Sequence, residues 1–173
     1  MAARAGRPLL RRVDSYVQRR VAAAFAGAPG QELAEDVLRR ARLANVYDHT
    51  TFGDPERVTI GDHTALNNAI LNTSSGRISI GDYTFFGHGV SLLTGTHDIR
   101  RLERERQLAI PPDGRDIVIG RGVWIASNAI ILGPCRIGDH AVVAAGSVVR
   151  EDVPELAVVG GIPARPLASI EPA

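Results

Sequence analysis

Six consecutive segments of six residues, running from 119 to 154, repeat one pattern of large and small side chains. Their first place is always aliphatic and is filled by Ile119, Ile125, Ile131, Ile137, Val143 and Val149. Their fifth place is always small or β-branched and is filled by Val123, Ala129, Cys135, Ala141, Ser147 and Val153. A helix would place apolar residues three and four apart, and a half-buried strand would alternate. A period of six fits neither and predicts a chain that runs straight, turns a corner and repeats.

Three such sides close one triangular coil of eighteen residues. The segment IGRGVW at 119 begins one coil, and IGDHAV at 137, eighteen residues later, begins the next. The aliphatic place points inward and stacks on the same place one coil away, while the small fifth place lets the interior close. Short fixed periods of this kind are typical of solenoids, including hexapeptide β-helices. The predicted fold class is therefore mainly β, a parallel β-helix built of hexapeptide repeats.

The same phase begins earlier, at Ile60, but it is interrupted twice. The hexads IGDHTA, LNNAIL and NTSSGR are followed by two extra residues before IGDYTF, which predicts a bulge or longer corner near Ser74–Arg77. After the hexad LLTGTH, residues 98–116 read DIRRLERERQLAIPPDGRD and contain no hexad. A charged segment of this length predicts a loop that leaves the β-helix, which in compact domains is usually functional or disordered.

The two ends of the chain do not follow the repeat. Residues 1–44 carry two apolar stripes at helical spacing, separated by a segment with Gly27, Pro29 and Gly30, and this pattern predicts two helices. Because the end coil of a solenoid exposes its core and its strand edges, we expect these helices to cap it. The predicted organisation is a helical N-terminal cap at 1–44, a β-helix at 45–155 with the loop 98–116 inserted, and a C-terminal tail at 156–173.

The bulk properties are those of an ordinary globular domain. The net charge of +1 gives no reason to expect a nucleic-acid partner. The one cysteine, Cys135, fills a small place of a hexad and is interpreted as a core residue, so no disulfide framework is expected. No apolar run approaches the length of a membrane span, and the N-terminus lacks the pattern of a signal peptide. We therefore expect a cytoplasmic protein without a transmembrane segment.

The run VWIASNAIILGPCRIGDHAVVAAGSVVREDVP, followed by GGIPARPL, resembles the hexapeptide-repeat acyltransferases, whose fold is a left-handed parallel β-helix. The nearest branch is the maltose/galactoside O-acetyltransferase type, and the match covers residues 45–168. The hexads alone indicate only the fold, whereas the GIPAR element and an upstream THD make the resemblance functional. It implies an acetyl-CoA-dependent O-acetyltransferase, needing no metal, that acts on a carbohydrate hydroxyl of a cell-surface polysaccharide or a sugar precursor.

His97 is the candidate catalytic base. It closes the last hexad before the long loop, within TGTHD, as the catalytic histidine of the family does. A hydroxyl that attacks a thioester must lose its proton, and a neutral imidazole can accept that proton near neutral pH. The imidazolium can then protonate the departing thiolate, so transfer in a ternary complex needs no covalent enzyme intermediate. The other ring nitrogen needs an acceptor, for which Asp98, Glu103, Glu105 or a backbone carbonyl would serve.

Two residues are candidates for binding the acceptor, and the first of them follows from the resemblance. Asn67 stands thirty residues before His97, as the acceptor-contacting asparagine of the family does, and an amide can both accept from and donate to sugar hydroxyls. Its alternative role is to cap a corner. Trp124 points outward from its hexad and is expected beside the acceptor, or else at a subunit interface. Two other acceptor positions of the family hold Gly53 and Ser75 here, so the acceptor can differ from a simple galactoside or maltoside.

The resemblance also places coenzyme A in the groove between two neighbouring β-helices. Three small residues match positions along the pantetheine arm: Ser127, Ala145 and Gly146. Arg150 and Arg165 are expected to bind phosphates of the nucleotide end, although Glu151, beside Arg150, would repel them. A backbone N–H of Ala126 or Ser127 is the candidate donor to the tetrahedral oxyanion.

A cofactor groove formed by two chains implies an oligomer, and the resemblance implies a homotrimer with its sites between subunits. Three alternatives stay open at this point. The first is an N-acetyltransferase that acts on an amino sugar, and the second is a non-catalytic hexapeptide scaffold. The third is a carbonic anhydrase of the same fold with three histidines on zinc. His88 and His97 are too far apart in sequence for its ligand pattern, and His49, His63 and His140 lie in variable places or irregular turns.

Overall fold

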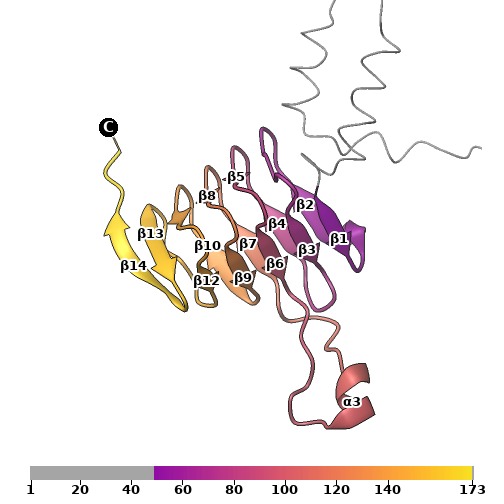
Figure 1. Ribbon diagram of the computed structural model, residues 1–173. Coiled ribbons are helices and arrows are strands. Elements are labelled where there is room, and N and C mark those ends of the chain that lie inside the picture. The colour runs from indigo at the N-terminus through magenta and orange to yellow at the C-terminus, as the bar shows by residue number, and fades with distance from the viewer. Residues whose placement is uncertain (1–48, 173) are drawn as a thin grey trace, which may run out of the picture.

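The computed structural model describes residues 49–172, so the two helices predicted at 1–44 lie outside the described residues. The described chain winds into coils whose strands form three sheets (Figure 1). Sheet A contains β1 (Thr50–Phe52), β3 (Ile70–Asn72), β6 (Ser91–Leu93), β9 (Ile130–Leu132) and β12 (Val148–Val149). Sheet B contains β2 (Val58–Ile60), β4 (Ile78–Ile80), β7 (Ile117–Ile119) and β10 (Cys135–Ile137). Sheet C contains β5 (Phe85–Phe86), β8 (Trp124–Ile125), β11 (Val142–Val143), β13 (Ala157–Gly161) and β14 (Ala164–Ser169).

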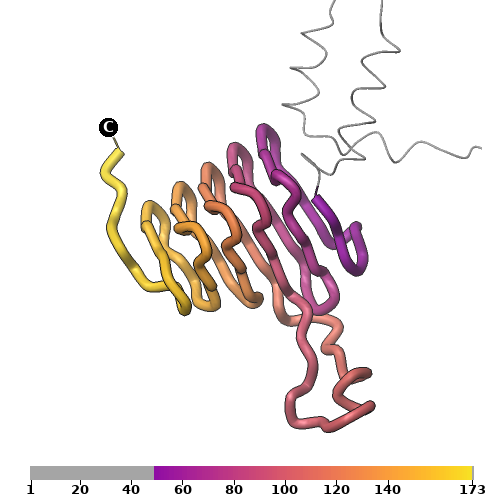
Figure 2. Tube along the Cα trace, viewed as in Figure 1, coloured from indigo at the N-terminus to yellow at the C-terminus, as the bar shows by residue number. Residues whose placement is uncertain are grey.

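Neighbouring strands in each sheet come from successive coils and run parallel, except for the final hairpin. In sheet C, Trp124 aligns with Val142, and in sheet A, Ile130 aligns with Val148. Both partners are eighteen residues apart, which confirms the coil length predicted from the hexads. Figure 2 shows the coils stacked along one axis.

The interior of the coils is the stack of aliphatic side chains that the hexads predict. Every residue in the first and fifth places from 119 to 153 is at most 5% exposed. Each fully buried Ile or Val contributes about 1.5–3 kcal/mol relative to an exposed side chain, so stacking between coils is the main source of stability. The predicted fold class is confirmed, with the core running along the axis.

The early coils depart from strict periodicity at their corners. Asn67 and Asn68 both have positive φ and form a corner that is one residue shorter than those of later coils. The hexad phase assigns Asn72 to the interior, but Asn72 is only half-buried. The inward residue of β3 is instead Leu71, which is fully buried. A turn at Ser74 and Ser75 then restores the phase, which confirms the longer corner predicted near Ser74–Arg77.

The corner between sheets A and B accommodates all the large insertions. In the first coil this corner contains the short 3-10 helix η2 (Pro55–Arg57). Between β9 and β10 the same corner consists of two residues, Gly133 and Pro134. In the coil between these, residues 94–116 leave the stack, carry the short helix α3 (Glu103–Leu108) and return at β7. Figures 1 and 2 show this loop projecting from one side of the β-helix, where every residue of α3 is exposed.

The segment predicted as a C-terminal tail, 156–173, contains the two strands β13 and β14. β13 extends sheet C by pairing with β11, and β14 turns back antiparallel to it. This hairpin buries Val159 and Gly160 and covers the free edge of the last coil in sheet C. Pro166 lies in the outer strand, where the missing N–H discourages pairing with another chain.

Candidate active site

The imidazole of His97 lies where the long loop leaves the β-helix, and the loop itself orients it. Nδ1 of His97 is 2.9 Å from the carbonyl oxygen of Arg106. A carbonyl only accepts hydrogen bonds, so Nδ1 carries the hydrogen and donates it, and Nε2 keeps its lone pair. The neutral ring is therefore held in the tautomer that a general base acting through Nε2 requires.

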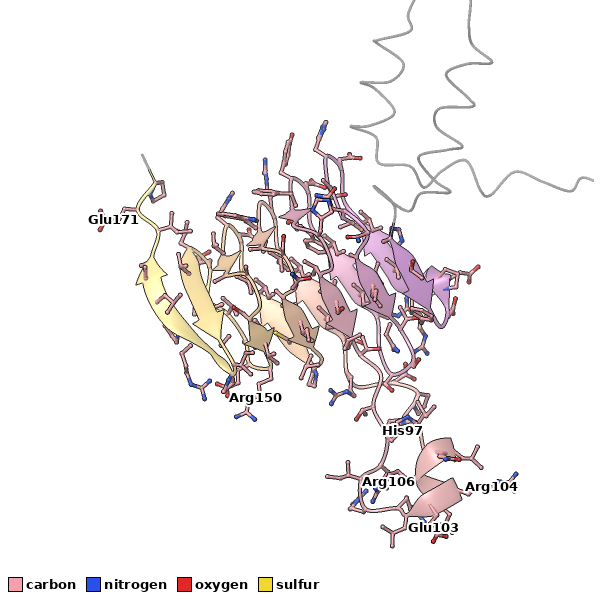
Figure 3. All side chains as sticks on the ribbon, in the orientation of Figure 1. His97, Glu103, Arg104, Arg106, Arg150 and Glu171 are labelled. Atoms are coloured by element: carbon pink, nitrogen blue, oxygen red, sulfur yellow. The ribbon has the colours of Figure 1, made fainter. Side chains whose placement is uncertain are left out.

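Arg106 itself is fixed by two further hydrogen bonds. Its Nε donates to the carbonyl of Arg101 (2.7 Å) and its Nη2 to the carbonyl of Ile99 (3.2 Å). Figure 3 shows the Arg106 side chain lying within the loop, close to His97. Its side chain thus closes the loop on itself while its carbonyl orients the imidazole. The sequence left the orienting group open, and no periodicity or motif in this loop distinguishes Arg106 from its neighbours.

The carboxylates near His97 in sequence bind other groups. Asp98 accepts from the backbone N–H and the Nε of Arg100, both at 3.0 Å. These hydrogen bonds from Arg100 lower the pKa of the Asp98 carboxyl. Glu105 lies 3.4 Å from Arg101, its ion-pair partner on the loop. The backbone carbonyl of Arg106 therefore takes the orienting role that these acids were candidates for.

The two ends of the loop are tied to the β-helix by polar contacts. The Asp98 N–H donates to the Ala109 carbonyl (2.9 Å), and this hydrogen bond joins the outgoing and returning segments of the loop. Nε of Arg115 donates to the Thr94 carbonyl (2.8 Å). From the first coil, Arg57 donates to the Pro112 carbonyl (2.7 Å) and pairs with Asp113 (3.0 Å). These contacts close the base of the loop and tie it to the first coil.

The predicted pantetheine residues lie at another corner, between sheets C and A. The Gly146 N–H donates to the Ser127 carbonyl across adjacent coils (2.9 Å), so the structure brings these two residues together, with Ala145 exposed beside them. Gly146 has φ of +67° with open space around its Cβ position, so its backbone conformation, more than crowding, favours glycine. The Ala126 N–H already donates to Val143 (2.9 Å), which removes it as an oxyanion donor. Among the described hydrogen bonds none uses the Ser127 N–H.

Asn67 occupies the same corner, three coils before Gly146. Its Nδ2 donates to the carbonyl of Phe86 in the next coil (2.7 Å), so one end of the amide caps the corner. Its Oδ1 makes none of the hydrogen bonds described for residues 49–172. The structure shows the capping role, and contact with an acceptor through Oδ1 stays a prediction.

Trp124 projects from the outer face of sheet C and is 45% exposed. Its ring stacks on that of Phe85 in the neighbouring strand, with centroids 5.9 Å apart and planes inclined by 14°. Phe85 is not among the site residues predicted from the sequence. Its position does carry a signal, because Phe85 ends the hexad IGDYTF just as Trp124 ends IGRGVW.

The two arginines predicted for the nucleotide phosphates meet around one carboxylate. Oε1 of Glu151 lies 3.6 Å from Nε of Arg150 and 3.7 Å from Nη1 of Arg165. All three side chains are more than half exposed, so these ion pairs contribute little to stability. Glu151 therefore lies between the two guanidinium groups. Figure 3 shows Arg150 on the same side of the molecule as His97.

One chain therefore carries the predicted residues in two separate groups. Asn67, Ser127, Ala145 and Gly146 lie where sheet C meets sheet A, whereas His97 and Arg150 follow strands of sheet A at their opposite ends. A strand of sheet A separates the groups, and no described hydrogen bond joins them.

The two positions that depart from the family pattern are Gly53 and Ser75. Gly53 has φ of +100°, and a Cβ there would lie 2.7 Å from the hydroxyl of Thr73. Ser75 is fully buried, and its hydroxyl has no hydrogen-bond partner among residues 49–172. Neither residue presents a side chain to an acceptor.

Residues 49–172 of one chain contain no group of three His, Cys, Asp or Glu side chains placed to hold a metal ion. The helices of this same part of the chain are all too short or too polar to cross a membrane.

The sequence and fold of this chain are similar to those of known proteins. The model of the bacterial transferase hexapeptide family (six repeats) matches residues 116–151. A hexapeptide-repeat acetyltransferase from Vibrio cholerae is 30% identical, with a TM-score of 0.59 over 91% of this chain and 90% of that one. The same protein has been solved in complex with acetyl coenzyme A, and that structure gives a TM-score of 0.55, 28% identity and coverage of 89% and 85%.

The matches to curated relatives span a smaller share of those proteins. A putative acetyltransferase of Saccharomyces cerevisiae is 28% identical over 83% of this chain and 74% of its own. The galactoside O-acetyltransferase of Escherichia coli is 29% identical over 69% of this chain, and the match spans 57% of that enzyme. Together with the stacked coils and the hexads, these similarities show that the chain belongs to the hexapeptide-repeat acyltransferase family, whose acetyl donor is acetyl-CoA.

Proposed function

We propose that this protein transfers the acetyl group of acetyl-CoA to a carbohydrate hydroxyl, with His97 as general base. The observation that carries this proposal is the hydrogen bond from His97 Nδ1 to the Arg106 carbonyl, which leaves Nε2 free to accept a proton. A base held in one tautomer before the substrates bind loses no orientation during the reaction.

The reaction is a direct transfer between two bound substrates. The acceptor hydroxyl oxygen attacks the thioester carbonyl carbon while Nε2 of His97 takes the hydroxyl proton. A tetrahedral intermediate forms, and the Ser127 N–H is the proposed donor to its oxyanion. When the carbon–sulfur bond breaks, the imidazolium returns the proton to the thiolate, so the products are the acetyl ester and free CoA.

The donor is proposed to lie along the corner formed by Ser127, Ala145 and Gly146, with its phosphates at Arg150 and Arg165. The small side chains at this corner let the pantetheine arm approach the backbone. The two guanidinium groups around Glu151 supply charge-assisted hydrogen bonds to phosphate oxygens. A phosphate must displace Glu151 from at least one of them.

A homotrimer would unite the two groups of residues. His97 and the pantetheine residues lie at opposite ends of sheet A in one chain, so a complete site requires the corner of a neighbouring copy. Cyclic threefold packing of prisms repeats this contact three times. Two exposed apolar residues of the loop, Leu102 and Leu108, would then contact the neighbour.

The carbohydrate acceptor is supported by similarity to the galactoside O-acetyltransferase and by the exposed ring of Trp124. The Asn67 Oδ1 is proposed to accept from a sugar hydroxyl. Because acetyl-CoA is a cytoplasmic metabolite, we place the reaction in the cytoplasm.

The proposal is tested by incubating purified protein with acetyl-CoA and a panel of mono- and oligosaccharides, and detecting acetylated sugar by mass spectrometry. Amino sugars in the same panel separate O- from N-acetylation through the alkali sensitivity of esters. We expect an alkali-labile acetyl ester on at least one sugar. Bound acetyl-CoA without transfer to any sugar would count against the carbohydrate acceptor, and failure to bind acetyl-CoA would favour a non-catalytic scaffold.

A further inference from the structure

The outer face of sheet C carries a row of side chains aligned from coil to coil. The row runs Ala65, Phe85, Trp124 and Val142, as the strand register fixes. Its two rings are stacked and nearly parallel, and Phe85 and Trp124 are 46% and 45% exposed. The smaller side chains on either side leave the rings standing above the sheet.

This pair has no role in the core. The core of the described residues runs inside the coils, and the side chain of the next residue, Phe86, already fills it at 1% exposure. An aromatic ring presents a negative face, and the polarised C–H groups on one face of a pyranose ring are attracted to it. Rings that already support one another also lose little conformational freedom when a ligand binds.

A polar group lies beside this apolar surface. Asn67 follows Ala65 by two residues, and its Nδ2 is bound to the carbonyl of Phe86, directly after Phe85. That bond fixes the amide, so its Oδ1 has a set position from which it can accept from a hydroxyl. An apolar platform with a fixed polar group at its edge matches the two sides of a sugar ring, one of C–H groups and one of hydroxyls.

We propose that Phe85 determines acceptor specificity, forming with Trp124 a platform on which a pyranose ring of the acceptor stacks. The proposal rests on the function proposed above and narrows it to acceptors that present a sugar ring. A small hydroxyl compound such as serine has no ring face to stack, so the platform discriminates against it.

The only tryptophan of the chain, Trp124, belongs to the platform, so intrinsic tryptophan fluorescence reports binding there without any turnover. Wild type, Phe85→Ala, Phe85→Tyr and Phe52→Ala are titrated with the oligosaccharides of the acceptor panel in the absence of acetyl-CoA. Phe52 is the matched control, because it is a phenylalanine 55% exposed on β1 of sheet A, away from the row. Acetyl transfer, thermal melting and light scattering are measured on the same four proteins.

We expect a saturable fluorescence change in wild type, Phe85→Tyr and Phe52→Ala. In Phe85→Ala the dissociation constant and the KM for the sugar should rise about 5- to 10-fold, with KM for acetyl-CoA, melting and mass unchanged. If Phe85→Ala behaves like Phe52→Ala, the proposal is wrong even when sugar acetylation stands. If Phe85→Ala changes the oligomeric mass, the pair is a subunit contact and the proposal is likewise wrong.

The two proposals can fail separately. A fluorescence response that is lost in Phe85→Ala, with no acetylated product from any sugar, supports the platform and contradicts the reaction. Transfer to sugars without any fluorescence response contradicts the platform alone, and the absence of both contradicts both.

Discussion

The regular coils and the inserted loop are two parts of one chain that are held by different forces. From β7 to β12, the structure depends on buried aliphatic side chains stacked at intervals of eighteen residues. Residues 98–113 have no buried side chain, and their conformation depends on hydrogen bonds such as those of Arg106 and Arg57. The rigid part supplies corners at fixed spacing, and the polar part holds the candidate base.

This difference separates stability from chemistry. Loss of a side chain inside the coils should lower the free energy of unfolding, while loss of a polar group in the loop should alter the rate of transfer and leave unfolding unchanged.

Replacing Ile131 by alanine should lower the free energy of unfolding by about 2–5 kcal/mol, because this fully buried side chain leaves a cavity between coils. The matched change in the loop is Ile99→Ala, where the isoleucine is 81% exposed, and it should cost less than about 0.5 kcal/mol. Urea denaturation of both variants makes the comparison. Equal losses would mean that the loop is packed more tightly than its exposure indicates.

Replacing Arg106 by alanine should lower kcat about tenfold, because the loop then no longer fixes the carbonyl that orients His97. Arg104→Ala is the control, since Arg104 lies on the same helix and its side chain makes none of the described hydrogen bonds (Figure 3). Steady-state kinetics and thermal melting are the measurements. An unchanged kcat in Arg106→Ala would show that the imidazole keeps its orientation without this side chain.

Removing Arg150 or Arg165 should raise KM for acetyl-CoA about fivefold each, with kcat nearly unchanged, because each loses a charge-assisted bond to phosphate. Glu151→Gln should lower KM slightly, because it removes the competing carboxylate. The same variants assayed with acetyl-pantetheine, which lacks the nucleotide, should differ little from wild type. If these variants also raise the KM for acetyl-pantetheine, Arg150 and Arg165 do not bind the phosphates.

The buried thiol predicts a pH effect confined to the coils. Burial, with a smaller effect from Asp152, raises the pKa of Cys135 from 9.0 to about 12. A raised pKa favours the neutral thiol in the folded state, so its contribution is complete below pH 9 and is lost as the pH rises towards and through 12. Wild type should therefore lose up to about 1 kcal/mol of unfolding free energy per pH unit above pH 9, relative to Cys135→Ala. Equal slopes in urea denaturation at pH 9 and 10.5 would show that the thiol ionises freely.

The same contrast explains how far the sequence predicts this structure. The inward residues of the regular coils follow from the hexads, because burial repeats wherever the backbone repeats. The pairing of Phe85 with Trp124 can also be predicted from the sequence, because both residues end equivalent hexads. Asn67 was placed at the acceptor by resemblance, and its bond to the Phe86 carbonyl emerged only from the contact between coils.

Other features follow no period and could not be read from it. The corner at Asn67 and Asn68 is one residue short, which moved the inward place from Asn72 to Leu71. The Arg106 carbonyl is one of many backbone acceptors in the loop, and only the folded loop selects it. The terminal hairpin uses ordinary antiparallel pairing, so nothing in a hexapeptide pattern marks it.

The most direct test is the rate of acetyl transfer by His97→Ala. It is measured at saturating acetyl-CoA with a sugar that wild type acetylates, and it tests whether the imidazole held by the loop is the base. The exposed ring makes no contribution to the core, so the variant should fold and melt like wild type. We predict a loss of about 10²–10⁴ in kcat with KM for acetyl-CoA nearly unchanged. A variant that binds acetyl-CoA and transfers acetyl within a fewfold of the wild-type rate would contradict the assignment of His97 as the base.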